Sequence, residues 1–223
     1  MKDFSGNLLL KNKYTPLTDS LVFIDCSMEK IVEKFVEWQK KIFLSTTVPK
    51  SIVCSTINSS SLEQSLQSMS LVKEGQPNKF LFMETKSNWT AYFENGVDGT
   101  DGISYPSFLS KLLNCKVIHI MAVPHSSSIE GALSFDLFSN RNKGSDFLNL
   151  ERSISLIHDS KWHFYASGEP LSFEKVEVYD SDFVTDKFTF DILSEYAFKM
   201  GISPFDIDFY IPEKSILVER VSI

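Results

Sequence analysis

The clearest periodicity in the chain is helical and lies near the N-terminus. Between Met28 and Phe43, apolar residues recur every three to four positions, and Ser27 immediately precedes this segment. This spacing gathers the apolar side chains on one side of the chain and predicts an amphipathic helix. By the same criterion, further helices are predicted over 61–69, Ser104–Leu113 and 189–200.

Most of the remaining chain has the pattern of β-strands. Apolar and polar residues alternate from Lys79 onward, and short runs of β-branched or apolar residues occur before and after this region. Strands are predicted over 21–25, 51–57, 80–85, 89–94, 116–123, Ala132–Phe138, 150–158, 162–166 and 215–221. Short loops between several of them favour antiparallel pairing. We therefore predict an α+β fold, with helices packed on one face of a mainly antiparallel sheet of five or more strands.

The length of the chain suits one domain. Its 223 residues are 43% hydrophobic and 23% charged, and they contain neither an internal repeat nor a low-complexity linker. We expect a single α+β domain over 1–223. A smaller helical lobe at about 1–75 is the alternative organisation.

The negative charge is concentrated near the C-terminus. The net charge is −7, yet residues 168–213 alone contain eleven acidic residues against three lysines, so this segment carries −8 and the rest is nearly neutral. Aromatic residues are interleaved with the acids. One interpretation is a solvated acidic face over an aromatic core; the other is a surface that meets a basic partner, in which acids speed association and aromatics supply contact energy. The candidate partner-binding residues are Glu177, Tyr179, Asp180, Asp182, Asp186, Asp206, Asp208 and Tyr210.

Composition argues against several other classes of protein. Only three residues are arginine and the lysines are dispersed, which disfavours nucleic-acid binding. The apolar run at 117–124 is much shorter than the ~20 residues that span a membrane, and the N-terminus lacks the apolar core of a signal peptide, so we expect a cytoplasmic protein. Three widely spaced cysteines form neither a disulfide framework nor a C-x-x-C metal pair. We expect no metal and no cofactor.

Common catalytic motifs are also absent from the sequence. It contains no G-x-S-x-G, no P-loop, no G-x-G-x-x-G and no H-E-x-x-H. Cys115 and His119 would lie roughly 13 Å apart along one strand, too far for a base to activate a thiol, and His119 is interpreted as a hydrogen-bonded histidine of the sheet. We expect a protein that is not an enzyme. The alternative function is an enzyme or small-molecule-binding protein of unfamiliar type, with a site near Asp98 and Asp101 or near His158 and His163.

Three motifs within residues 89–210 resemble a family of uncharacterised, immunity-like bacterial proteins found near secreted polymorphic toxins. They are WTAYF at 89–93 with NG at 95–96 and GTD at 99–101; WHFYASG at 162–168 with FE at 173–174 and Tyr179; and GISPF at 201–205 with DFY at 208–210. The resemblance implies a cytosolic immunity-type protein that binds and neutralises a cognate toxin. Together with the charge pattern, it predicts that the acidic, aromatic-rich segment blocks a basic active site of the toxin; it supplies no catalytic residues.

Overall fold

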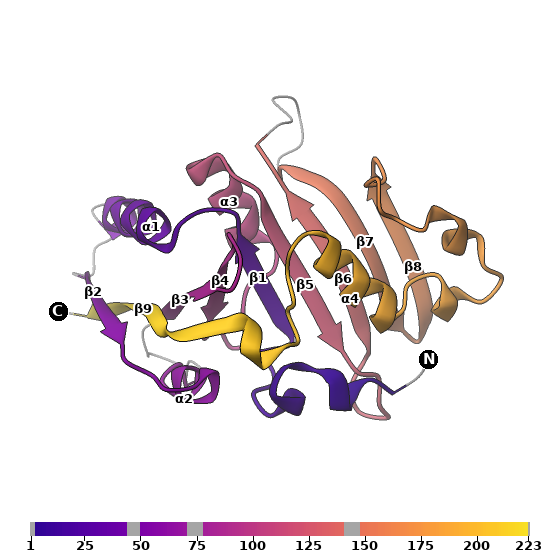
Figure 1. Cartoon of the computed structure of the whole chain (residues 1–223), viewed down its shortest axis with the longest axis horizontal. Helices are drawn as coiled ribbons and strands as arrows, with labels where there is room; N and C mark the ends of the chain where they lie inside the picture. Colours follow the sequence, from indigo (N-terminus) through magenta and orange to yellow (C-terminus); the bar gives the residue numbers. More distant parts are fainter. Residues whose placement is uncertain (1–2, 44–49, 71–77, 141–147, 223) are drawn as a thin grey trace.

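The computed structural model describes residues 3–43, 50–70, 78–140 and 148–222, and its centre is one nine-stranded sheet. Figure 1 shows the sheet running across the molecule. The strands are β1 (Ser20–Ile24), β2 (Lys50–Ile57), β3 (Lys79–Thr85), β4 (Thr90–Glu94), β5 (Val117–Val123), β6 (Ala132–Phe138), β7 (Leu150–Asp159), β8 (Lys161–Gly168) and β9 (Tyr210–Ser222). Their order is β2-β9-β3-β4-β1-β5-β6-β7-β8, and all neighbouring pairs are antiparallel. The predicted α+β class with a mainly antiparallel sheet is confirmed.

Strands from both ends of the chain lie inside the sheet. β1 occupies its middle and pairs with β4 and β5, while β9 is inserted between β2 and β3. The first 75 residues therefore contribute β1 and β2 to the same sheet as the rest of the chain. β2 and β8 form the two outer edges.

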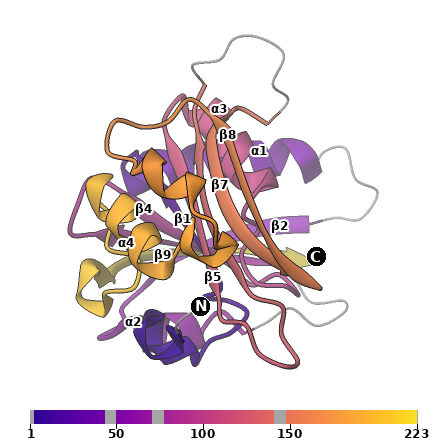
Figure 2. The ribbon, with the colours of Figure 1, turned by 90° about the vertical axis from the view of Figure 1, so that its right-hand side faces the viewer.

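The α-helices are α1 (Met28–Phe43), α2 (Leu62–Gln67), α3 (Ser104–Leu113) and α4 (Phe190–Lys199). They cover both faces of the sheet, so the expected packing on one face is wrong. α1 and α3 pack on one side. α2 and α4 pack on the other side, together with residues of the N-terminal segment that precedes β1. Figure 2 shows the two layers on opposite sides of the strands.

The physical reason is the composition of the central strands. In β1, Leu21 and Phe23 point into one hydrophobic cluster, whereas Val22 and Ile24 point into the other. Because successive side chains of a strand point to opposite faces, such a continuous apolar run requires cover on both. Phe35 of α1 supplies part of this cover, since its ring lies 4.9 and 5.3 Å from those of two β3 phenylalanines, Phe80 and Phe82.

On the opposite face of the sheet, the packing of α4 positions the acidic segment 168–213. α4 begins after Thr189, whose hydroxyl accepts a hydrogen bond from the amide of Ile192, as a helix N-cap does. Leu193, Tyr196 and Ala197 are buried. The ring of Tyr196 lies edge-on to Phe135 of β6 at 6.4 Å. α4 is thereby held against the sheet, and the chain leading to it from β8 is fixed at both ends.

Candidate functional site

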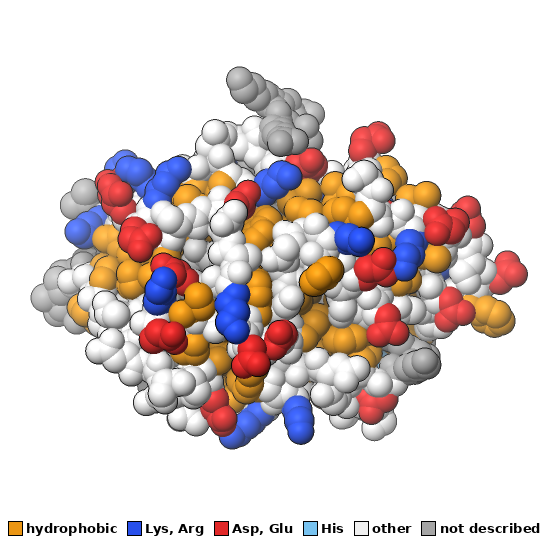
Figure 3. Space-filling view, in the orientation of Figure 1, with side chains coloured by type: hydrophobic (Ala, Val, Ile, Leu, Met, Phe, Trp, Pro, Cys, Tyr) orange, Lys and Arg blue, Asp and Glu red, His pale blue; other side chains and the backbone are white. Residues whose placement is uncertain are grey.

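Four exposed acidic residues gather on the segment that joins β8 to α4. This segment contains two short 3-10 helices, η3 (Val176–Asp180) and η4 (Val184–Asp186). Residues 176–186, which we call the 176–186 surface, include exposed carboxylates and exposed apolar side chains. The carboxylates are Glu177, Asp180, Asp182 and Asp186, and the apolar side chains are Val176, Phe183 and Val184. Figure 3 shows acidic and hydrophobic side chains together at this end of the molecule.

Phe183 is the most prominent apolar side chain of this surface. It is 71% exposed, although burial of a phenylalanine would ordinarily contribute about 1.5–3 kcal/mol to stability. It stands between Asp182 and Val184, and both are exposed. An aromatic ring in solvent beside carboxylates is the composition expected of a contact residue within a charged rim.

A buried ion pair supports the segment from beneath. Nε and Nη2 of Arg152, on β7, donate to the two carboxylate oxygens of Glu174 at 2.9 and 2.6 Å. The two side chains are only 3% and 0% exposed. Nη1 of Arg152 also donates to the backbone oxygens of Ser167 and Gly168. Burial tends to lower the pKa of Arg152, but the hydrogen bonds and charge of Glu174 outweigh it and raise that pKa.

Tyr179, predicted as a contact residue, is part of this support. Its hydroxyl donates to Glu174 at 2.9 Å and lies 3.1 Å from the hydroxyl of Tyr196, while its ring packs on Phe164 of β8. Burial, together with these hydrogen bonds, raises the pKa of Tyr179. Tyr179 is half-buried, so its main contacts are internal.

The other predicted residues lie elsewhere. Asp206 and Asp208 are exposed at η5 (Ile207–Phe209), where Asp206 is the N-cap, on the chain that follows α4. They lie outside residues 176–186, although the chain before them turns back along α4, since Phe205 packs on Phe190 with ring centroids 4.7 Å apart. Tyr210 is buried, and its hydroxyl donates to the backbone oxygen of Pro204 at 2.7 Å. Tyr210 was predicted as a contact residue, whereas Phe183 was not. Acidic residues flank both aromatic residues, so their neighbours in the sequence do not distinguish the buried residue from the exposed one.

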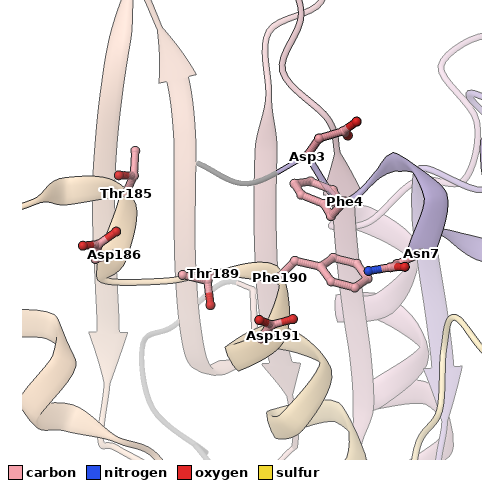
Figure 4. A pocket seen from close by; sticks show the side chains of 8 residues that line it. All are labelled: Asp3, Phe4, Asn7, Thr185, Asp186, Thr189, Phe190 and Asp191. Carbon is pink, nitrogen blue, oxygen red and sulfur yellow. The ribbon is translucent and has the colours of Figure 1, made fainter.

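A pocket of about 240 Å³ adjoins the 176–186 surface (Figure 4). Its lining comes from the N-terminal segment, η4 and the start of α4, and includes three carboxylates, Asp3, Asp186 and Asp191. The rings of Phe4 and Phe190 are stacked in its wall with centroids 4.9 Å apart. Such a combination of negative charge and aromatic surface suits the alkyl chain and cationic head of lysine or arginine.

A second polar group lies inside the sheet. Ser20 Oγ is 2.6 Å from Nε2 of His119, and Nδ1 of the same ring is 2.9 Å from Oδ2 of Asp136. Ser134 and Ser153 also donate to Asp136, and these hydrogen bonds lower its pKa although burial alone would raise it. The prediction that His119 is a hydrogen-bonded sheet histidine is confirmed.

The order serine, histidine, aspartate is that of hydrolase triads, but this serine is enclosed. Ser20, His119 and Asp136 are all buried, with His119 only 1% exposed. Gly102 closes over the imidazole, because a Cβ at that position would lie 2.2 Å from Nε2. In this closed arrangement the three side chains link β1, β5 and β6 by hydrogen bonds within the sheet, and substrate has no access to Oγ.

The two histidines of the alternative site are separated. The register pairs His163 with Ile157 and His158 with Trp162, so the two histidines point to opposite faces of the sheet. Asp101 accepts hydrogen bonds from the amides of Ile103 and Ser104 at the start of α3, while Asp98 is exposed. Within the described ranges, no group of three or more histidine, cysteine, aspartate or glutamate side chains is arranged to hold a metal ion.

Comparison with known proteins gave no relative: no family model, no curated protein and no solved structure matches this chain. Among the helices of the described residues, none has the length and apolar character needed to cross a bilayer.

Proposed function

We propose that this protein is an immunity-type inhibitor that binds a basic protein toxin through the 176–186 surface. The observation that carries the proposal is the 71% exposure of Phe183 among the exposed carboxylates of Glu177, Asp180, Asp182 and Asp186. Carboxylates attract a positively charged partner over a distance, while an aromatic ring buried on contact slows dissociation.

The support beneath this surface favours tight binding. Because Arg152 and Glu174 hold the segment against β7, and Tyr179 packs beneath it, little conformational entropy is lost on association. The neighbouring pocket would receive a lysine or arginine of the toxin between Asp186 and Asp191. Covering the basic cleft of a toxin in this way would exclude its substrate.

The bacterial and cytoplasmic parts of the proposal derive from the resemblance to immunity-like proteins. Two of its motif segments lie next to the proposed surface, since residues 162–168 form most of β8 and residues 173–179 contain Glu174 and Tyr179. The proposed activity is inhibition by binding. It requires no catalytic residue, cofactor or nucleic acid.

The test is calorimetric titration of the protein with the candidate toxin encoded by the adjacent gene. Phe183→Asp should weaken binding by about 2 kcal/mol or more, roughly thirtyfold, as expected for a central aromatic contact. Phe198→Asp is the matched control, because Phe198 is 69% exposed on α4, outside residues 176–186. Equal losses in the two variants, or no binding by the wild type, would refute the proposal.

A further inference from the structure

The edge strand β2 presents an unpaired line of backbone hydrogen-bonding groups. Its inner side pairs with β9, where Ile52 faces Arg220, Cys54 faces Val218 and Thr56 faces Ile216. In the part of the chain that the structure describes, no strand pairs with its outer side. Such an edge is a template for a further strand.

The register shows which residues turn outward. The amide of Arg220 donates to the backbone oxygen of Asn78, on the β3 side of β9, at 3.1 Å. In an antiparallel ladder each residue directs its amide and carbonyl to the same side, and successive residues alternate. Arg220 and, at intervals of two, Val218 and Ile216 therefore face β3. Their β2 partners Ile52, Cys54 and Thr56 direct amide and carbonyl away from β9.

The only charged residue of β2 is Lys50, at its first position, and the rest of the edge carries no residue that blocks pairing. Residues 51–57 contain no charged residue and no proline, the two residue classes that most often protect an edge. Val53 is 45% exposed, and Cys54, Ser55 and Thr56 are exposed as well. Ile52, Val53 and Thr56 are β-branched and favour extended backbone.

We infer that β2 pairs antiparallel with β2 of a second copy, so that the protein is a two-fold symmetric dimer with one sheet continuous across both chains. Antiparallel pairing of an edge with itself satisfies a two-fold axis and closes the assembly at two copies. The register that pairs the three outward residues among themselves places Cys54 opposite Cys54 of the second copy and Ile52 opposite Thr56. Each facing pair exchanges two backbone hydrogen bonds.

The charge distribution favours pairing of two copies through β2 over pairing of two copies through β8. β8 lies beside the 176–186 surface, so that pairing two β8 edges would bring two strongly acidic segments together. β2 lies at the opposite edge of the sheet, and pairing there keeps both acidic surfaces apart and accessible. Pairing of β2 with β8 would not close and would produce filaments.

The test measures molar mass by light scattering after gel filtration, at tens of micromolar chain. The wild type and Cys54→Ser should have twice the chain mass of 25.4 kDa, whereas Cys54→Lys and Cys54→Pro should have the single-chain mass. Lysine places like charges opposite each other, and proline removes an amide that points away from β9 and fixes φ. Circular dichroism and a thermal melt show whether each variant is folded. If Cys54→Pro does not fold, the test uses Cys54→Lys alone.

Chemical cross-linking locates the contact. Facing Cα atoms of a hydrogen-bonded antiparallel pair are about 5.5 Å apart, so a short bismaleimide should join two wild-type chains through Cys54. Cys54→Ser, which retains Cys26 and Cys115, should give no cross-linked dimer. Any of five results would overturn the inference. Three concern the molar mass of the wild type and the lysine variants: a single-chain mass for the wild type, a dimer that persists in Cys54→Lys, or a dimer lost only in the β8 variant Ala166→Lys. The other two are cross-linking that persists in Cys54→Ser and assemblies larger than a dimer.

Discussion

Arg152 and Glu174 form a buried, bidentate ion pair that joins β7 to the chain entering the 176–186 surface. Removing one partner leaves a buried charge without compensation, so Glu174→Gln should lower the free energy of unfolding by about 3–5 kcal/mol. The double variant Arg152→Met/Glu174→Leu should lose less than the sum of the single variants. Urea denaturation measures both. A Glu174→Gln protein within about 0.5 kcal/mol of the wild type would show that the pair does not support the segment.

Tyr179 should contribute to the same support through its hydroxyl. Tyr179→Phe removes the hydrogen bonds to Glu174 and Tyr196 but keeps the ring on Phe164, so we expect a loss of about 1–2 kcal/mol in unfolding free energy. Tyr165→Phe is the control, because Tyr165 is exposed on β8 and should lose almost nothing. Equal losses in the two variants would contradict the role given to Tyr179.

Stability should depend on the ionisation of Asp136. Hydrogen bonds from His119, Ser134 and Ser153 lower its folded-state pKa from 3.8, despite burial. The stabilisation it provides is therefore fully present above this ordinary value and is lost as the pH falls through the lower folded-state pKa. Urea denaturation between pH 2 and pH 7 should show a shallower acid limb in Asp136→Asn than in the wild type. Parallel limbs would contradict the predicted linkage.

Gly102 should tolerate no side chain. A Cβ there would lie 2.2 Å from His119 Nε2, so Gly102→Ala should force the imidazole or the loop to move and cost about 1–3 kcal/mol. Gly6→Ala is the matched control, because no heavy atom lies within 4 Å of its added Cβ. Thermal unfolding compares the two variants, and similar melting temperatures would show that the loop over His119 adjusts freely.

Periodicity was sufficient to predict the main elements of the fold. The three-to-four spacing over 28–43 corresponds to α1, and the alternation after Lys79 corresponds to the antiparallel strands. The helices were predicted on one face, although the apolar run in β1 is covered on both, because the sequence alone does not show where α2 and α4 pack. Helix placement depends on packing between segments distant in the chain.

The polar networks could not be derived because they depend on strand register. Ser20 and His119 are 99 positions apart, and Arg152 and Glu174 are 22 apart. The available signal was a charged residue within a largely apolar strand, Asp136 in β6, which indicates a buried partner without identifying it. The sequence also could not show which aromatic residues are exposed, since Phe183 and Tyr210 have similar acidic neighbours but opposite burial.

The charge of the 176–186 surface provides the most direct test of the proposed function. Asp182→Asn/Asp186→Asn and Asp206→Asn/Asp208→Asn each remove two exposed carboxylates, one pair from this surface and the other from beyond α4. Association with the toxin encoded by the adjacent gene is measured by stopped flow. The association rate of the wild type should depend strongly on ionic strength. At low salt, the rate should be about tenfold lower for the first variant and nearly unchanged for the second. Association that ignores ionic strength, or equal slowing by the two variants, would contradict binding through the 176–186 surface.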